Sequence, residues 1–329
     1  MKLTALLAIT VLALTQAVYA AAAPAPVPVP VPAAAAAPAD AGAKTPVPLF
    51  GASQFDLASK ISGRTYRIFV YKPLVPAPPS GYPVLFVTDG NGIFPLAAAQ
   101  TALLGLEGKG AIVVGIGYPT DDYMRPMTLR YRDLTPVTED KTLFPTQPPL
   151  AEADQGGASE LFYRFITEEL RPAVSAAYPL DAHKQTLYGH SLGGLFVLGV
   201  MFKHPESFNN YVASSPSIWW DKRSVLKGEG GFLAQTKSAK HPIRLLICVG
   251  SKEQDPYSQA PPGGPPLSEI NKRIAEARMV ENARGLAKRL ALSGAKSGMV
   301  VRFQEFSAEN HVSVIPASIS RALGFALEP

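Results

Sequence analysis

Residues 186–202, TLYGHSLGGLFVLGVMF, constrain the fold of this 329-residue chain more than any other stretch. An apolar, strand-like run ends at Gly189, and a second apolar run of helical character begins at Leu192. Between them, Gly189 to Gly193 match the pattern G-x-S-x-G. A strand that turns directly into a helix strains its central residue and leaves no room for flanking side chains, which explains the glycines. The segment therefore predicts a nucleophilic Ser191 at the carboxyl end of a β-sheet.

Apolar segments alternate with helical patterns from about Phe50 onward. Continuous apolar strands separated by helices are typical of a mostly parallel sheet that is covered on both faces. With the G-x-S-x-G corner, this pattern predicts an α/β fold of the α/β-hydrolase type, in one domain over residues 49–329. The expected strands are 65–71, 82–90, 111–117, 185–189, 209–215, 243–250 and 299–306, and helical spacing covers 158–174 and 276–292.

The N-terminal region is predicted to be a signal peptide followed by a spacer. Lys2 precedes an apolar segment, residues 3–14, that is shorter than the roughly 20 residues needed to span a bilayer. The sequence Val18-Tyr19-Ala20 fits a small-x-small cleavage site. We expect cleavage after about Ala20 and a periplasmic or secreted protein without stable membrane insertion, the alternative being an uncleaved anchor. Residues 21–48 are rich in Ala, Pro and Val, which predicts a disordered spacer of polyproline character.

Composition argues against several classes of protein. The net charge is +5, but no block of five Lys or Arg residues occurs, so nucleic acid is not an expected partner. The single cysteine, Cys248, cannot form an internal disulfide, and its apolar surroundings predict a buried side chain. The sequence contains neither a metal-binding motif nor a phosphate-binding glycine loop, and we expect no cofactor and no metal.

A serine hydroxyl needs a base, and in this fold the order along the chain is serine, acid, histidine. His311 follows the last expected strand, where the base is expected. His241 precedes a strand and so lies at the wrong end of the sheet, whereas His204 ends the helix of the nucleophile. His311 is therefore the predicted base.

The acid would orient the histidine and stabilise its charged form. Glu253 stands three residues after Gly250, which ends a strand, and is the first candidate. Asp255 is the alternative in the same segment. Glu281 is a third candidate, but its position in an expected helix favours a solvated side chain.

Two backbone N–H groups are candidates for binding the oxyanion of a tetrahedral intermediate. One belongs to Leu192, the residue after the nucleophile. The other is expected from the loop after an early central strand, where Asp89-Gly90-Asn91-Gly92 offers the N–H group of Asn91. An ordinary turn is the alternative for this segment.

Two long segments rich in Pro are expected to be loops. Residues 119–156 contain Arg125, Arg130 and Arg132 and are the better candidate for a functional loop. Residues 255–270 have the character of a flexible insertion.

Six motifs occur in the order typical of one family: VTDGNGIF, RYRDLTP, YGHSLGGLFVL, ASSPSIWW, VGSKE and ENHVSVIPASISRAL. From about Phe50 onward the chain resembles the esterase branch of the α/β-hydrolases. This branch contains ferric-siderophore trilactone esterases, esterase D and, more distantly, mycolyltransferases; the periplasmic siderophore esterases are the most similar. The resemblance implies a Ser191–His311 site, an oxyanion hole from Asn91 and Leu192, and an acid at Glu253. Some siderophore esterases lack a well-placed acid and work with a serine–histidine dyad.

The resemblance also implies how the substrate is held. Enterobactin-type relatives use an arginine and an aromatic residue near the nucleophile to bind anionic catecholates. Here Arg130 and Arg132 offer the cation, and Trp219 and Trp220 offer the rings. The alternative for Arg132 is a structural clamp with Asp133.

The sequence thus predicts a serine esterase that hydrolyses ester or lactone bonds through an acyl-enzyme, with an iron-loaded catecholate trilactone siderophore as the favoured substrate. Any iron would arrive with that substrate. The alternatives are a general carboxylesterase or a feruloyl or acetyl esterase, and a non-catalytic binding protein on a hydrolase fold. The predicted signal peptide argues against a cytosolic S-formylglutathione hydrolase.

Overall fold

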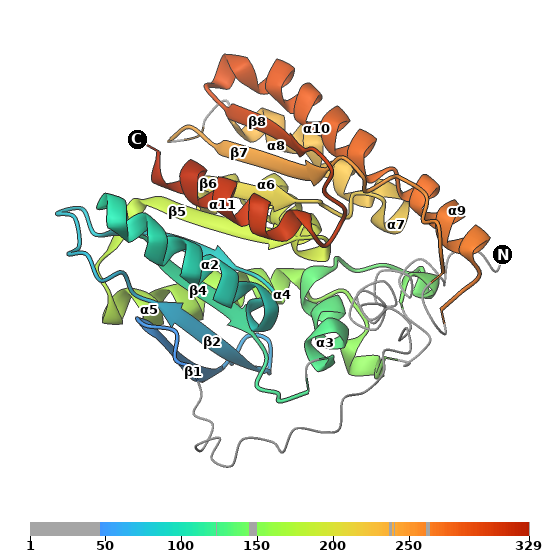
Figure 1. The fold of residues 1–329 in the computed structure, drawn as a ribbon. Coiled ribbons are helices and arrows are strands. Elements are labelled where there is room, and N and C mark those ends of the chain that lie inside the picture. The colour runs from blue at the N-terminus through green and yellow to red at the C-terminus, as the bar shows by residue number, and fades with distance from the viewer. Residues whose placement is uncertain are drawn as a thin grey trace, which may run out of the picture.

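The computed structural model describes residues 47–122, 124–144, 150–236, 239, 241–260 and 264–328. The predicted signal peptide and residues 21–46 of the predicted spacer lie outside these described residues. Within the described part, one eight-stranded sheet runs through the molecule in the order β1-β2-β4-β3-β5-β6-β7-β8 (Figure 1). The strands are β1 Ala52–Ala58, β2 Thr65–Tyr71, β3 Tyr82–Val87, β4 Ile112–Gly117, β5 Leu180–His190, β6 Asn210–Ser214, β7 Arg244–Gly250 and β8 Val300–Phe306.

The sheet is mostly parallel, as predicted. Strand β2 pairs antiparallel with both β1 and β4, and every other neighbouring pair is parallel. All the expected strands are present, although the one expected over 82–90 ends at Val87. Strand β1 was not predicted, because it is an edge strand whose side chains are mostly exposed and which therefore has no apolar pattern.

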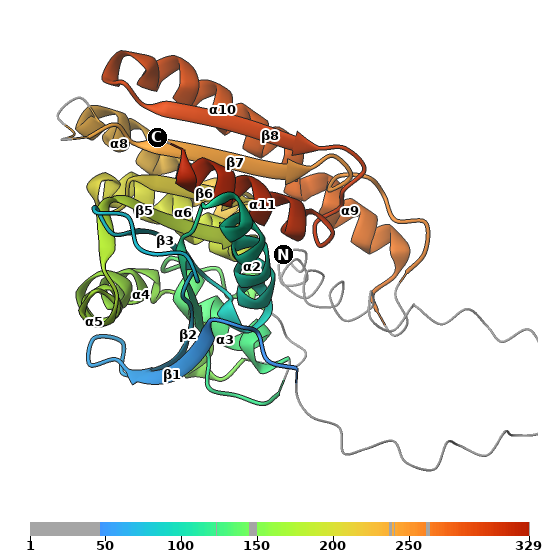
Figure 2. The same ribbon diagram turned by 60° about the vertical axis from the view of Figure 1, so that its left-hand side comes forward.

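Helices cover both faces of the sheet (Figures 1 and 2). One hydrophobic cluster joins the sheet to the helices on one face, including Phe162, Phe196 and Leu286, and a second cluster joins it to the other face through Phe94 and Leu323. No helix in the described ranges has the length and apolar character needed to cross a membrane. The helices are α2 Gly90–Leu104, α3 Arg125–Leu134, α4 Ser159–Arg164, α5 Arg171–Ala177, α6 Leu192–Lys203, α7 Trp220–Arg223, α8 Glu229–Gln235, α9 Leu267–Ala277, α10 Met279–Gly294 and α11 Val314–Leu327.

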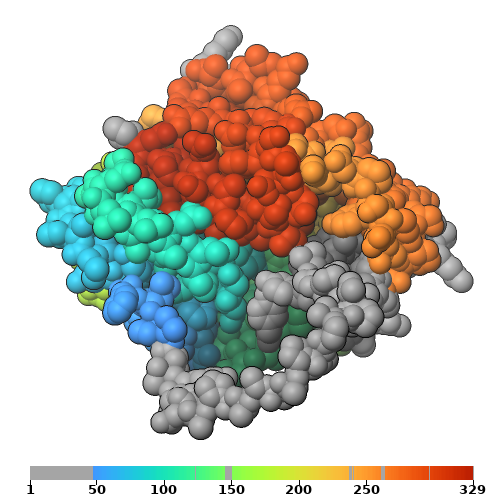
Figure 3. Space-filling model, viewed as in Figure 1, coloured from blue at the N-terminus to red at the C-terminus, as the bar shows by residue number. Residues whose placement is uncertain are grey.

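The second cluster lies under α2 and α11, which adjoin each other on the face shown in Figure 3. Helix α2 carries the predicted oxyanion donor Asn91 in its first turn, and α11 follows the loop that carries His311. The packing of these two helices therefore positions two elements of the predicted site.

The expectation of a long loop over residues 119–156 was wrong, because α3 lies inside it and carries Arg130 and Arg132. The buried face of α3 includes Arg130 and Asp133 alongside Tyr131 and Leu134. Since two of these buried side chains are charged, the helix has no clear apolar stripe from which it could have been predicted.

The expectations for residues 255–292 also need correction. Helix α9 begins at Leu267, inside the expected insertion, while residues 261–263 lie outside the described part of the chain. The helical pattern over 276–292 is divided between α9 and α10, because Arg278 has a left-handed backbone with φ 45°. Apolar spacing did not reveal this break, since the pattern of α10 begins immediately at Met279. The pattern over 158–174 lies within α4, a π-helical segment, Phe165–Leu170, and α5.

Close contact between α2 and β4 depends on glycine. A Cβ atom at Gly115 would lie 2.7 Å from Cβ of Phe94, and one at Gly90 would lie 2.7 Å from the backbone of Gly115. We expect Gly115→Ala to lower the free energy of unfolding by about 1–3 kcal/mol, because overpacking displaces the helix. Urea denaturation would measure the change.

Gly199→Ala is the matched control. A Cβ atom at Gly199, inside α6, meets nothing within 4 Å. Alanine is favoured over glycine within a helix, so this variant should gain about 0.5–1 kcal/mol. Equal loss of stability in both variants would contradict the proposed packing constraint.

Candidate active site

Ser191 occupies a strained corner between β5 and α6. Its backbone has φ 61° and ψ −117°, a conformation that costs a non-glycine residue about 1–3 kcal/mol. A Cβ atom at Gly189 would lie 2.2 Å from the carbonyl oxygen of Gly193, and one at Gly193 would lie 2.4 Å from Oγ1 of Thr88. The two glycines therefore allow the close packing that holds the corner in place.

A chain of hydrogen bonds joins Ser191, His311 and Glu253. Oγ of Ser191 lies 3.1 Å from Nε2 of His311, and Nδ1 of His311 lies 2.7 Å from Oε2 of Glu253. The carboxylate at Nδ1 favours a proton on that nitrogen, which leaves Nε2 free to accept one from the serine. The arrangement can therefore remove the serine proton and stabilise the imidazolium that results.

Glu253 is fully buried but well paired. Its side chain has 0% exposure. Its Oε1 accepts hydrogen bonds from Oγ of Ser215 at 2.5 Å and from the N–H group of Gly250 at 2.6 Å. These donors offset the cost of removing a carboxylate from water and fix the direction in which Oε2 points.

The other two candidate acids lie elsewhere. Asp255 is exposed, and the hydrogen bonds of the His311 ring go to Glu253 and Ser191 instead. The carboxylate of Glu281 lies 4.0 Å from Nε of Arg278, in the first turn of α10. In the turn after β7, the N–H group of Glu253 bonds to the carbonyl of Gly250 at 3.2 Å. This turn brings the carboxylate of Glu253, of the three candidates, to His311.

Two further serines, which were not predicted, contact the hydrogen-bonded residues Ser191 and Glu253. Ser215 has a left-handed backbone, φ 43°, and bonds to Glu253. Oγ of Ser217 lies 3.4 Å from Oγ of Ser191, and its N–H group donates to the carbonyl of Ser191 at 3.1 Å. Both serines could have been predicted from their position just after β6, since the carboxyl ends of neighbouring parallel strands share one edge of the sheet.

The N–H groups of Asn91 and Leu192 lie in the first turns of α2 and α6. First-turn N–H groups have no partner within their own helix and carry the positive end of its dipole. Among the described residues, neither N–H group donates a hydrogen bond. The Asn91 side chain is occupied elsewhere: its Oδ1 accepts from the N–H group of Tyr118 at 2.7 Å, and its Nδ2 donates to the Tyr118 carbonyl at 3.0 Å.

The predicted substrate-binding arginines lie within internal networks. Arg130 is 5% exposed and forms a two-bond pair with Asp89, Nε to Oδ1 at 2.6 Å and Nη2 to Oδ2 at 2.9 Å. Arg132 pairs with Asp133 at 3.2 Å and donates to the carbonyl of Ser62 at 2.9 Å. The contact between Arg132 and Asp133 is the structural clamp that was considered as the alternative.

The two predicted tryptophans differ in exposure. Trp220 is fully buried, with its ring 6.1 Å from that of Tyr131 and 5.6 Å from that of Phe144. Its Nε1 has no hydrogen-bond partner in the part of the chain that the structure describes. Trp219 is partly buried, with its ring 5.8 Å from that of Trp220, and is the one of the pair with surface available for contact.

His190, beside the nucleophile, is a buried neutral base that the sequence analysis did not consider. Its Nδ1 lies 3.1 Å from Oγ of Ser214, and its ring centroid lies 4.7 Å from that of His311. Burial first, and then His311 and Arg130, hold the pKa of His190 well below the ordinary value. His190 therefore supports the ring of His311 without adding a charge beside it.

Cys248 lies in β7 and is fully buried, as predicted. Burial raises the pKa of its thiol to about 12, which keeps it protonated near neutral pH and makes it a poor nucleophile. Among the described residues, no three His, Cys, Asp or Glu side chains gather in a way that could hold a metal ion.

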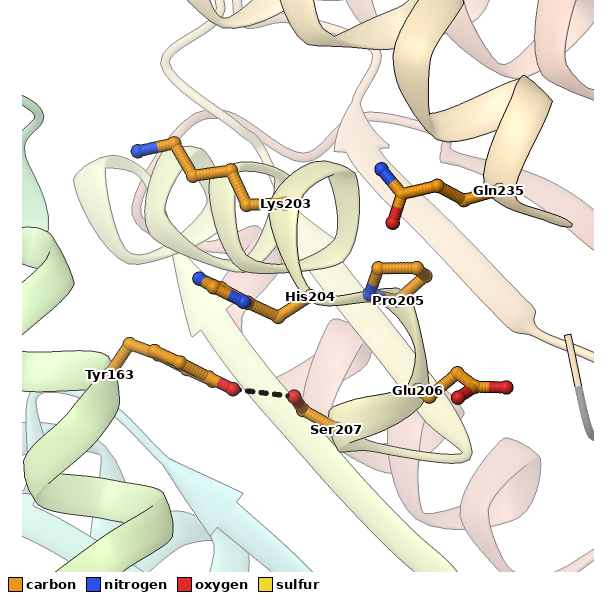
Figure 4. Close-up of a pocket in the computed structure, with 7 residues that line it drawn as sticks. All are labelled: Tyr163, Lys203, His204, Pro205, Glu206, Ser207 and Gln235. Carbon is orange, nitrogen blue, oxygen red and sulfur yellow. Dashed lines mark hydrogen bonds between the residues drawn. The ribbon is translucent and has the colours of Figure 1, made fainter.

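A surface hollow of about 410 Å³ lies at the carboxyl end of α6 (Figure 4). Ser191 lies at the opposite, amino end of this helix. Polar side chains in and beside it bind one another: Tyr163 OH lies 2.7 Å from Oγ of Ser207, and Nε2 of His204 lies 2.9 Å from Glu160. The hollow is therefore separate from the candidate active site. Its lining residues are Tyr163, Lys203, His204, Pro205, Glu206, Ser207 and Gln235.

Comparisons with known proteins identify a family of esterases with this fold. The family model described as "Putative esterase" matches residues 59–285. The ferri-bacillibactin esterase of Bacillus subtilis is 39% identical over 83% of this chain and 88% of its own. The siderophore triacetylfusarinine C esterase of Aspergillus fumigatus is 34% identical over 86% of this chain and 96% of its own.

Among solved structures, the BES protein of Bacillus cereus superposes with a TM-score of 0.74 at 32% identity, covering 88% of this chain and 100% of its own. Sequence and structure thus lead to the same group of proteins. The chain belongs to this esterase family and is a carboxylic ester hydrolase with the α/β-hydrolase fold.

Proposed function

We propose that the protein is a siderophore esterase that uses Ser191, His311 and Glu253 to hydrolyse an ester or lactone bond through an acyl-enzyme. The observation that carries the catalytic part is the pair of hydrogen bonds from Ser191 Oγ to His311 and from His311 to Glu253. The relatives named for siderophore esters support the substrate class. A ferric trilactone is the favoured substrate.

In the first half of the reaction, His311 takes the proton of Ser191 as Oγ attacks the ester carbonyl carbon. The carbonyl oxygen becomes an oxyanion, which the N–H groups of Asn91 and Leu192 bind. The tetrahedral intermediate then breaks the bond to the leaving alkoxide, which receives the proton from His311. Glu253 stabilises the imidazolium while it exists.

In the second half, His311 accepts a proton from water, and the resulting hydroxide attacks the acyl carbon. Collapse of this second intermediate returns the proton to Ser191 and releases the carboxylic acid. For a lactone, acid and alcohol remain parts of one opened chain. The predicted signal peptide supports a location in the periplasm or outside the cell, which is part of this proposal.

Among the predicted substrate contacts, exposure favours Trp219, whereas burial and internal pairing favour structural roles for Arg130, Arg132 and Trp220. A partly exposed indole offers a face on which an aromatic ring of the substrate can stack. We therefore retain Trp219 as the aromatic substrate contact and propose that Arg130 and Arg132 have structural roles.

The nucleophile is tested with a fluorophosphonate probe, which forms a covalent bond with an activated serine. We expect stoichiometric labelling of the wild-type protein and none of Ser191→Ala, because the substitution removes the only atom proposed to react. Hydrolysis of p-nitrophenyl acetate should be lost in parallel. Labelling of the alanine variant would show that another residue is the nucleophile.

The acid is tested by comparing two substitutions in the same turn. Glu253→Gln should lower kcat by about 10³- to 10⁴-fold, because an amide favours the wrong tautomer of His311. Asp255→Asn should stay within about twofold of the wild type, since Asp255 is exposed and the hydrogen bonds of the His311 ring go to Glu253 and Ser191. A serine–histidine dyad would instead show nearly unchanged kcat in Glu253→Gln.

The substrate is tested by comparing kcat/KM for ferric enterobactin, p-nitrophenyl acetate and methyl ferulate. The proposal predicts that the ferric trilactone is the best of the three by at least about 10-fold, a difference of 1.4 kcal/mol in transition-state binding. Trilactone turnover no faster than background would exclude the siderophore assignment. Faster turnover of methyl ferulate would favour the feruloyl esterase alternative.

A further inference from the structure

Two corners of the sheet carry the proposed oxyanion donors. The Asp89 corner, residues 89–91, joins β3 to α2 and contains the N–H group of Asn91. The Ser191 corner, residues 190–192, joins β5 to α6 and contains the N–H group of Leu192. Both contain a residue with a left-handed backbone, since Asp89 has φ 57° and Ser191 has φ 61°.

Arg130 connects these two corners. From α3, its guanidinium donates two hydrogen bonds to the carboxylate of Asp89, and Nη2 also donates to the carbonyl of His190 at 3.1 Å. One buried side chain therefore binds the residue at which the Asp89 corner begins and the residue immediately before the nucleophile.

The first turn of α6, which follows the Ser191 corner, packs closely against the start of the Asp89 corner, where Gly193 leaves the space. A Cβ atom at Gly193 would lie 2.4 Å from Oγ1 of Thr88 and 3.2 Å from Oδ2 of Asp89. The Asp89 carboxylate is therefore close to the first turn of α6 and is also bound by the guanidinium of Arg130. Movement of this carboxylate would alter the packing between α6 and the Asp89 corner.

The contacts of Arg130 are better suited to this linkage than to holding an anionic substrate. Its side chain is 6% exposed, and Asp89 already balances its charge. Burial acts to lower the pKa of Arg130, but the Asp89 carboxylate, together with Tyr131 and Tyr118, acts to raise it, and the net pKa lies above the ordinary value, so the side chain stays charged. A planar guanidinium can hold a carboxylate with two bonds and still reach a carbonyl, which the single ammonium group of lysine cannot do in the same geometry.

We propose that Arg130 is a positioning residue that holds the Asp89 corner and the Ser191 corner at the separation at which the N–H groups of Asn91 and Leu192 bind one oxyanion. The inference rests on the proposed function, because an oxyanion forms only if Ser191 attacks an ester. Arg130 then acts on the transition state through the two corners, and its removal should affect kcat more than KM.

The test uses Arg130→Gln and Arg130→Lys with uncharged p-nitrophenyl acetate and with ferric enterobactin. Titration with the fluorophosphonate probe gives the fraction of active sites, so that kcat refers to folded enzyme. We expect kcat per site to fall about 10- to 100-fold for both esters, while KM stays within about threefold. Inhibition by a trifluoromethyl ketone, which places an oxyanion in the same position, should weaken by a similar factor.

Arg130→Gln leaves the carboxylate of Asp89 without its partner, which can impair folding. Asp89→Asn and the double variant Asp89→Asn/Arg130→Gln avoid a lone buried charge. If Arg130 acts through Asp89, the double variant should lose about as much kcat as the more affected single variant. If instead the fold-losses in kcat of the two single variants multiply in the double variant, the two residues act independently and the proposed linkage is contradicted.

Arg244→Gln is the matched control. Arg244 is also a partly buried arginine that binds a carboxylate, Glu328, and a backbone carbonyl, that of Phe325 at 3.3 Å. It lies at the amino end of β7, opposite the edge that carries Ser191. Its substitution should leave kcat per site and trifluoromethyl ketone inhibition unchanged.

Two results would overturn the inference. Unchanged kcat for p-nitrophenyl acetate with an increased KM for ferric enterobactin would make Arg130 a substrate ligand. A smaller active fraction with normal kcat per site would make it a purely structural residue. Failure of the proposed function is a separate observation, because the wild-type protein would then show no ester hydrolysis that depends on Ser191.

Discussion

The left-handed backbone at Ser191 is the constraint on which the arrangement at the carboxyl edge of the sheet depends. A chain that leaves β5 and enters α6 at once must turn within one residue, and the contacts at Gly189 and Gly193 show how little space the turn leaves. The strained conformation persists because neighbouring strands hold it: the N–H group of Ser191 donates to Ser214 at 2.9 Å. As a result, the hydroxyl lies 3.1 Å from Nε2 of His311, and within the described ranges the N–H group of Leu192 has no hydrogen-bond partner.

The partners of Ser191 follow the sheet in order. Strands β5, β6, β7 and β8 are adjacent and parallel, so their carboxyl ends lie side by side. Ser191 follows β5, Ser215 follows β6, Glu253 follows β7 and His311 follows β8. From β5 to β8, each strand that follows in the sequence is therefore also the next strand in the sheet. The sequence order of serine, acid and histidine is a direct consequence of this topology, while Asn91 reaches the edge from β3 on the other side of β5.

Charged groups are buried at this edge only where they are paired. Glu253 has three partners, and Asp89 shares two hydrogen bonds with Arg130. A buried charge without such partners would be costly, so these networks allow a polar edge within an otherwise apolar interior. They also explain why α3 escaped prediction: its buried face uses Arg130 and Asp133 where a hydrophobic stripe would be expected. The same burial and pairing support the positioning role that is proposed for Arg130.

The sequence by itself determined the mostly parallel sheet, the sharp corner at Ser191 and the position of His311 after the last strand. These features are local, because apolar runs, flanking glycines and chain order carry them without knowledge of distant contacts. Only the tertiary structure distinguished the positions of Glu253, Asp255 and Glu281, since the turn after β7 brings the carboxylate of Glu253 to His311. It also placed Arg130 between two corners that are about 100 residues apart in the chain. Such contacts depend on how loops and helices pack over the sheet edge, which residue spacing does not encode.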